Sequence, residues 1–188
     1  MNKKNIKGIL SKLLAVLFVA AVVAYVVVNR NTDGEYKPVV EGDRAPEFVL
    51  PLLGGGKVDL AKERGKVVFI NFWATWCPAC KEEMPAMQWL YNRLMKKYPG
   101  KFVMWAVNVD TVAVPDIVFK YMKKLNLSFP VPLDTKGKVK NRYKTTGVPE
   151  TYIIDKRGIV FRKVIGPDNW RDPSRYLPIE ALIIKTFP

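Results

Sequence analysis

The pattern of apolar and polar positions predicts several short strands and helices after about residue 42. Residues 67–73 read VVFINFW, a nearly continuous run of β-branched and aromatic side chains that is typical of a strand buried on both faces. Between residue 77 and about residue 97, apolar side chains recur at spacings of three and four, which predicts a helix. Residues 102–109 again have the pattern of a buried strand.

The remaining elements are shorter and are separated by turn residues. Two apolar runs on either side of three consecutive glycines predict a hairpin over residues 48–60. Further elements are expected as helices over residues 115–125 and 174–185 and as strands over residues 151–154 and 159–164. This order of elements predicts an α/β fold in which helices flank a mixed β-sheet.

The N-terminal segment has a different pattern, because sixteen uncharged and mostly aliphatic residues at 13–28 follow four lysines. Counted back through Ile9, the run reaches about twenty residues, which is the length that a bilayer requires. An excess of lysine before a span places the N-terminus in the cytoplasm. We therefore predict a cytoplasmic basic segment at 1–12, one transmembrane helix at 13–28, a tether at 29–41 and a folded domain at 42–188.

Two alternatives to an uncleaved anchor remain for this segment. A cleaved signal peptide should have an apolar region of roughly 7–15 residues that ends at small residues, whereas this run ends in three valines and an asparagine. A buried core helix is the other alternative. We favour the single-pass anchor, which places the domain outside the cytoplasmic membrane, in a periplasm or on the outer face.

Composition narrows the possible functions. Among the 188 residues, 31 are basic and 17 are acidic, which gives a net charge of +14 and by itself suggests nucleic acid as a partner. An extracytoplasmic domain argues against that partner, and we interpret the charge as a solvated surface near anionic lipid. The chain has no histidine and only two cysteines. This excludes nucleophile pairs with histidine, zinc sites with histidine, and four-thiolate metal sites within one chain.

The two cysteines lie in the segment Trp-Cys-Pro-Ala-Cys, at the junction between the predicted strand and helix. At a helix N-terminus the sulfur of Cys77 faces unpaired backbone N–H groups, which stabilise its thiolate. Pro78 suits the first helical position. Cys80 lies one turn further on and can resolve a mixed disulfide with Cys77. The pattern indicates a redox-active disulfide with no other cofactor. An inert disulfide or two buried core thiols are the alternatives.

Three segments resemble a known family. They are GDRAPEF at 42–48, GKVVFINFWATWCPACKEEMP at 65–85 and GVPETYIID at 147–155. All three are similar to segments of the membrane-anchored thioredoxin-like proteins of the TlpA/ResA/DsbE group, and the resemblance covers most of the predicted domain. It implies a thioredoxin-like fold and the activity of a thiol–disulfide oxidoreductase.

The resemblance also implies roles for residues. Cys77 would be the attacking nucleophile and Cys80 the resolving thiol. Pro149 would be a cis-proline opposite them, and Val148 before it would offer its backbone to a partner peptide as an added strand. The substrate-binding residues expected from the resemblance are Trp76, Pro78, Val148 and Pro149.

Two acidic residues match acidic positions of the family, where a carboxylate adjusts thiol pKa values and transfers protons. Glu83 lies three residues after Cys80, and Glu150 follows the expected cis-proline and would lie across the same site. Thioredoxin has an aspartate six residues before its first cysteine, where this chain has Asn71, which cannot titrate. We therefore expect Glu83 and Glu150 to act with the cysteines, although a solvated surface position is the alternative for each.

The favoured function is reduction of protein disulfides outside the membrane. Substrates of this kind in the family are apocytochrome c or another assembly factor, and a membrane thiol electron donor would supply the electrons. The Pro-Glu-Thr after Val148 resembles the cytochrome-maturation branch. The direction of electron flow does not follow from the sequence, because small differences in potential decide it.

Two other functions were weighed. A Cu(I)-binding metallochaperone would use Cys77 and Cys80 as soft ligands, assisted by Met84 or Met87. A peroxidase is suggested by the Ala-Pro-Glu-Phe before the predicted hairpin, which also resembles the start of peroxiredoxins. The peroxidase pattern P-x-x-x-T-x-x-C fails, however, at both cysteines.

Overall fold

The computed structural model describes residues 3–30, 37–111 and 114–187, and the chain divides into two compact units with a boundary after Lys37. In the first unit, the helix α1 spans Lys3–Arg30 and includes the predicted anchor at 13–28. Among the described residues, no helix has both the length and the apolar character that crossing a bilayer needs. The side chains of residues 26–28 of the predicted anchor and residues 31–36 of the predicted tether lie outside the described residues.

The second unit has strands and helices close to the predicted ranges. Its strands are β1 (Val49–Pro51), β2 (Lys57–Asp59), β3 (Val67–Trp73), β4 (Phe102–Asn108), β5 (Glu150–Ile154) and β6 (Val160–Ile165). Its helices are the 3-10 turn η1 (Leu60–Glu63) and the α-helices α2 (Pro78–Lys97), α3 (Val114–Lys124), α4 (Lys138–Tyr143) and α5 (Pro173–Ile184). Each predicted strand and helix is present, with ends that differ by at most one residue.

Four strands form the main sheet in the order β4-β3-β5-β6. The strand β3 pairs in parallel with β4 and antiparallel with β5, and β6 pairs antiparallel with β5, so the sheet is mixed as predicted. All seven residues of β3 are buried, which confirms the prediction of a central strand. The predicted hairpin is the antiparallel pair β1 and β2.

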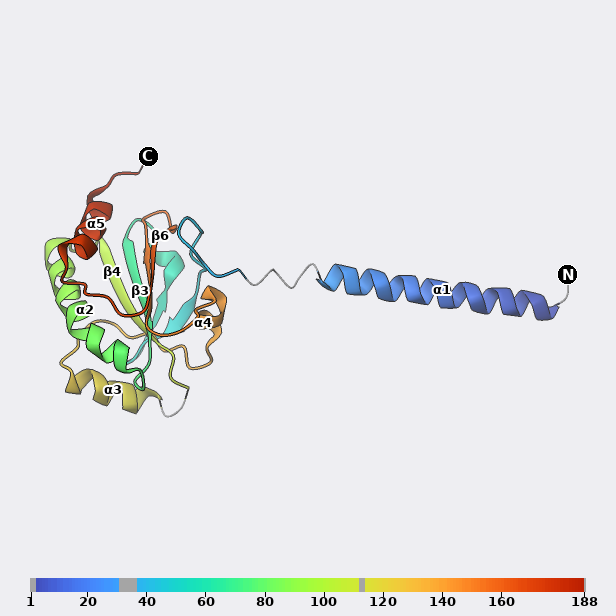
Figure 1. Ribbon diagram of the computed structural model, residues 1–188, viewed down its shortest axis with the longest axis horizontal. Coiled ribbons are helices and arrows are strands. Elements are labelled where there is room, and N and C mark those ends of the chain that lie inside the picture. Colours follow the sequence, from blue (N-terminus) through green and yellow to red (C-terminus); the bar gives the residue numbers. More distant parts are fainter. Residues whose placement is uncertain (1–2, 31–36, 112–113, 188) are drawn as a thin grey trace. The chain divides into compact units, whose positions relative to one another are not determined.

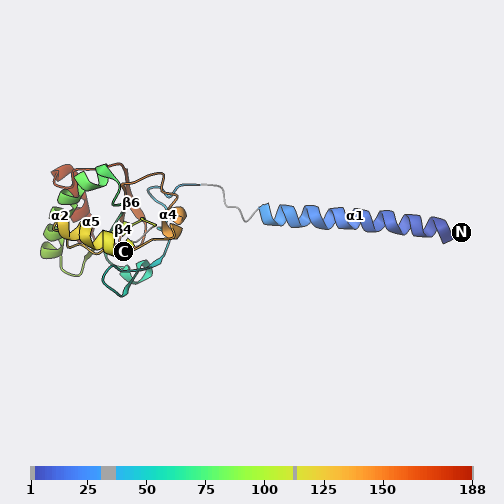
Figure 2. The same cartoon turned by 90° about the horizontal axis from the view of Figure 1, so that it is seen from below.

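Alternate side chains of β3 point to opposite faces of the sheet, and each face has its own cover. The helices α2 and α5 lie on one side and α4 lies on the other (Figure 1), and the view from below shows the same separation (Figure 2). On the first face the ring of Phe69 meets the buried Trp170 at 4.8 Å. On the second face Phe72 packs against Tyr143 of α4 at 5.4 Å.

The helix α4 was not predicted. It has six residues, of which only Val139 and Tyr143 are buried. Two apolar positions at a spacing of four are too few to establish a helical period. Tyr143 is nevertheless one of the largest fully buried side chains and fills the second face of the sheet.

Candidate functional site

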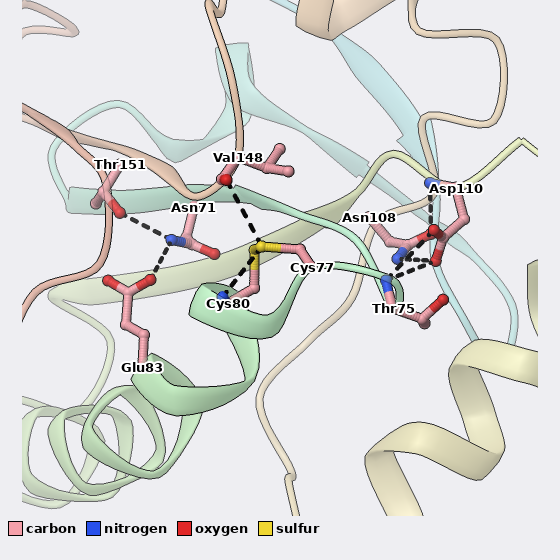
Figure 3. Close-up of a disulfide and its surroundings, with 9 residues drawn as sticks. All are labelled: Asn71, Thr75, Cys77, Cys80, Glu83, Asn108, Asp110, Val148 and Thr151. Carbon is pink, nitrogen blue, oxygen red and sulfur yellow. Dashed lines mark hydrogen bonds between the residues drawn. A yellow bond between two sulfur atoms is a disulfide. The ribbon is translucent and has the colours of Figure 1, made fainter.

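The disulfide lies at the N-terminus of α2, directly after the central strand. Cys77 is the N-cap residue of this helix, and its Sγ accepts a hydrogen bond from the backbone N–H of Cys80 at 3.1 Å. Pro78 occupies the first helical turn, where its missing N–H leaves no bond unmade. Cys77 and Cys80 form a disulfide, with their Cα atoms 5.3 Å apart. The predicted position of the pair is therefore confirmed (Figure 3).

The loop before β5 faces the disulfide. The peptide bond between Val148 and Pro149 is cis, as the resemblance implies. The carbonyl oxygen of Val148 lies 3.6 Å from Sγ of Cys77. Beside the disulfide, Trp76 is 68% exposed, while Cys77 and Cys80 retain 4% and 1% exposure. The structure thus gathers the four expected substrate-binding residues around Cys77, the more accessible of the two sulfur-bearing residues.

Glu83 lies on α2 one turn beyond Cys80 and is only 3% exposed. Its Oε1 accepts a hydrogen bond from Nε1 of Trp170 at 2.5 Å, and its Oε2 accepts one from Nδ2 of Asn71 at 3.3 Å. Nδ2 of Asn71 also donates to Oγ1 of Thr151 at 2.9 Å. Glu83 therefore points from the helix onto the sheet beside the disulfide, where Asn71 of β3 links it to Thr151 of β5 (Figure 3).

The surroundings of Glu83 favour its neutral form. Burial raises the pKa of Glu83 from 4.5 to about 7, against hydrogen bonds from Trp170, the backbone of Asp168 and Asn71, which stabilise the ionised form. The negative charge of Asp168 raises the pKa further. Glu83 also lines a surface hollow, together with Glu82 and residues 167–169. Glu83 can therefore take up and release a proton near neutral pH.

Glu150 does not lie across the same site as Glu83, because successive residues of a strand point to opposite faces. Thr151 reaches Asn71 on the face of α2, so Glu150 points to the other face, where it is 0% exposed. Its Oε2 accepts from the backbone N–H and the hydroxyl of Thr146, at 3.1 and 3.2 Å. Its Oε1 accepts from the hydroxyl of Tyr152 and pairs with Nζ of Lys163 at 3.0 Å. The expectation of a shared site was wrong, and Glu150 instead ties down the loop that leads to Val148.

Sequence reasoning missed a third buried carboxylate. Asp110 is 6% exposed and accepts hydrogen bonds from the backbone N–H of Thr75, at 3.1 and 3.3 Å, and from Nδ2 of Asn108 at 2.8 Å. Figure 3 shows this cluster on the opposite side of the disulfide from Glu83. It fixes the turn between β3 and Cys77 to the end of β4. The available signal in the sequence was an aspartate directly after the predicted buried strand at residues 102–109.

Trp170 was missed as well, since it lies in a polar segment far from the cysteines in the sequence. Its indole is completely buried and donates a hydrogen bond to Oε1 of Glu83. A lone tryptophan among glycine, proline and charged residues was the available signal. In the part of the chain that the structure describes, no group of three or more acidic, cysteine or histidine side chains could hold a metal ion. Met84 and Met87, weighed above as copper ligands, are fully buried in the core.

Comparisons with known proteins agree with this geometry. The AhpC/TSA family model matches residues 41–163. The chain is 37% identical over 161 residues to the thiol-disulfide oxidoreductase ResA of Geobacillus kaustophilus, covering 86% of this chain and 89% of that one. It is 36% identical over 154 residues to the thioredoxin-like protein YneN of Bacillus subtilis, covering 80% and 88% of the two chains.

A solved structure is similar too. The crystal structure of a DsbE-type thiol:disulfide interchange protein from Chlorobium tepidum superposes with a TM-score of 0.66 at 31% identity, covering 77% of this chain and 99% of that one. The four-stranded mixed sheet with a disulfide at the start of α2 is thus a thioredoxin-like fold. The chain belongs to the AhpC/TSA family, and it is a thiol–disulfide oxidoreductase of the ResA/DsbE kind.

Proposed function

We propose that this enzyme reduces disulfides of other proteins outside the cytoplasmic membrane, with residues 13–28 as its anchor. The observation that carries the proposal is the placement of Cys77. Its sulfur caps a helix and lies 3.6 Å from the backbone carbonyl of Val148, the residue before the cis-proline. An extended substrate segment that pairs with the backbone of Val148 would bring its own sulfur to Cys77.

The reaction proceeds in two exchanges. The thiolate of Cys77 attacks one sulfur of the substrate disulfide and releases the other as a thiolate, which takes up a proton. Cys80 then attacks the mixed disulfide at Cys77, which releases the second substrate thiol and forms the Cys77–Cys80 disulfide. Both electrons pass from this enzyme to the substrate, and a membrane thiol electron donor restores the dithiol.

Glu83 is the proton carrier in this proposal. It lies one turn from Cys80 and lines the surface hollow beside Asp168. Its pKa of about 7 allows it to hold a proton in part of the molecules and to accept one in the rest. That property suits a group that must supply a proton to the substrate thiolate as it leaves.

The substrate is proposed to be apocytochrome c or another assembly factor with a reducible cysteine pair. The support is the Pro-Glu-Thr at residues 149–151, which resembles the cytochrome-maturation branch of the family. Glu150 of this segment contacts Thr146 and Lys163, and it holds the loop that leads to Val148.

The reduction potential of the Cys77–Cys80 pair tests the direction of electron flow. Equilibration in dithiothreitol or glutathione buffers, followed by tryptophan fluorescence, gives the value. A potential near or below that of thioredoxin, about −270 mV, supports a reductant. A potential near about −120 mV, as in a strong oxidant, would contradict the proposed direction.

Substrate identity is tested by trapping. Cys80→Ser removes the resolving thiol, so a mixed disulfide between Cys77 and the substrate should accumulate and can be identified by mass spectrometry. Cys77→Ser is the matched control, because it keeps one thiol but removes the proposed attacking sulfur. Equal trapping by both variants, or by neither, would contradict the proposed roles of the two cysteines.

Membrane attachment is tested on the full chain. The protein should stay with the membrane fraction after an alkaline carbonate wash, because residues 13–28 lack charge and α1 includes them. A variant with Val19→Arg and Val22→Arg places two charges within that run and should be released. Release of the unaltered chain would contradict the anchor.

A further inference from the structure

One oxygen beside the disulfide lacks a partner. Among the described residues, four buried side-chain oxygens have no hydrogen-bond partner: Oδ1 of Asn71, the hydroxyls of Tyr121 and Tyr143, and Oδ2 of Asp168. A buried acceptor without a donor is costly and calls for an explanation. Asn71 is only 1% exposed and is the one of the four that belongs to the central strand under the disulfide.

The orientation of the Asn71 amide is fixed by its nitrogen. Nδ2 donates to Oγ1 of Thr151 on the next strand and to Oε2 of Glu83 on the helix above. The oxygen must therefore point away from both of these acceptors. Figure 3 shows it pointing toward the sulfurs of Cys77 and Cys80.

The oxidised state explains why this oxygen has no donor. In the disulfide neither sulfur carries a hydrogen, so neither can donate. After reduction the buried Cys80 carries an S–H group that needs an acceptor. Both oxygens of Glu83 already accept a hydrogen bond, and the carbonyl of Val148 lies beside Cys77, whereas Oδ1 of Asn71 accepts none.

We propose that Oδ1 of Asn71 accepts the S–H hydrogen of Cys80 in the reduced protein, so that Asn71 is a positioning residue that stabilises the dithiol state. The inference rests on the redox activity of the Cys77–Cys80 pair. Two thiols of a reductant such as glutathione supply two electrons and two protons. The S–S bond breaks, and the reductant becomes a disulfide. Cys80 keeps one proton as the thiol bound to Asn71, and the other proton goes to Cys77 or, where Cys77 stays a thiolate, to solvent.

Asn71 also connects the thiol to Glu83. When Glu83 is ionised, its hydrogen bond from Nδ2 becomes stronger. The stronger bond polarises the amide and makes Oδ1 a better acceptor. The chain thus extends from Cys80 through Asn71 to the carboxyl. Through this amide the resolving thiol is sensitive to the charge on Glu83 without touching it.

The first experiment measures the equilibrium constant for reduction by glutathione. Asn71→Leu keeps the approximate volume but removes the oxygen, and the hydrogen bond lost is made only in the reduced state. With an ordinary bond strength, the constant should fall about five-fold, which corresponds to about 20 mV at 29.6 mV per tenfold change. The bond of Nδ2 to Thr151 does not depend on the oxidation state, so its loss cancels.

Two controls separate this effect from general damage. Tyr143→Phe removes another buried hydroxyl without a partner, on the opposite face of the sheet. Thr151→Val removes a partner of Nδ2 but leaves Oδ1 in place. Neither should change the constant by more than about 1.5-fold, because neither alters a bond that depends on the oxidation state.

The second experiment needs no change at Asn71 and decides the matter if Asn71→Leu does not fold. In the full chain with 13C-labelled asparagine, the side-chain carbonyl resonance of Asn71 should move on reduction by dithiothreitol. In a Cys80→Ala variant under the same conditions it should stay at the oxidised position. An unmoved resonance after reduction, or an unchanged constant in Asn71→Leu, would overturn the proposal. A disulfide that no thiol reduces would overturn the redox function itself.

Discussion

Two glutamates are buried on opposite faces of the same sheet, and their neighbours differ in charge. Glu83 is 3% exposed and accepts hydrogen bonds from the indole of Trp170 and the amide of Asn71, which are both neutral. Glu150 is 0% exposed and pairs with the ammonium group of Lys163 at 3.0 Å. The residue type and the degree of burial are the same, but only one of the two carboxylates has a cation beside it.

The difference separates two tasks that a buried carboxylate can perform. Without a cation, burial raises the pKa of Glu83 to about 7, which leaves a proton that can be exchanged beside the disulfide. With a cation and the hydroxyl of Tyr152, Glu150 serves as a fixed acceptor for the loop at Thr146. A buried acidic residue near an active site is therefore a candidate for proton transfer only after its partners are known.

The largest expected effect comes from removing the cation. Lys163→Met leaves Glu150 buried without its ion pair, which should lower the free energy of unfolding by about 3–5 kcal/mol. Urea denaturation followed by circular dichroism measures it. Lys66→Met is the matched control, because its ion pair with Glu63 is partly exposed and should be worth less than about 1 kcal/mol. Similar losses of unfolding free energy in both variants would contradict the larger contribution expected of the Lys163–Glu150 pair.

The second effect is a dependence of stability on pH. Between pH 4.5 and about 7 the folded protein keeps a proton on Glu83 that the unfolded chain has released. The free energy of unfolding should therefore fall as pH rises through this window, by up to about 3 kcal/mol at 1.36 kcal/mol per pH unit.

Glu83→Gln removes this titration and should flatten the fall, so that the variant gains stability over the unaltered protein at pH 8 but not at pH 4. Urea denaturation of the oxidised protein at several pH values measures the difference. Glu82→Gln changes the exposed neighbour and should leave the profile as it was. Parallel profiles for Glu83→Gln and the unaltered protein would show that Glu83 does not titrate in this window.

The smallest effect sharpens the comparison at Trp170. Trp170→Phe removes the indole N–H that stabilises ionised Glu83, so the pKa of Glu83 should rise above about 7. A hydrogen bond to a charged group is worth about 1.5 kcal/mol, which moves the titration midpoint upward by about one pH unit. The carboxyl resonance of 13C-labelled glutamate reports it. Trp105→Phe alters a buried tryptophan on the other face of the sheet and should not move that midpoint.

Much of the fold could be predicted because its signals are local. The strand at residues 67–73 has the same bounds in the sequence pattern and in the structure, since seven consecutive buried side chains leave little ambiguity. The start of α2 follows from Cys77 and Pro78 at a helix N-terminus. The helix α4 could not be found in this way, because Tyr143 packs against Phe72 of β3, which lies far back along the chain.

The site could be predicted only in part. The two cysteines and the cis-proline belong to short motifs, which a sequence shows directly. The partners that give each carboxylate its character were not. Trp170 is 87 residues from Glu83, and which face of β5 Glu150 occupies depends on the pairing of that strand with β3. Such contacts are set by tertiary packing, which a single sequence does not reveal.

The cap on α2 also has a consequence for local dynamics. The backbone N–H of Cys80 donates to Sγ of Cys77, so the proposed attacking sulfur is also the first acceptor of the helix. A thiolate accepts more strongly than a disulfide sulfur, because it carries a full charge. Reduction should therefore make the first turn of α2 open less often, and oxidation should loosen it. The hydrogen-exchange rate of the Cys80 backbone amide should therefore report the redox state of the enzyme.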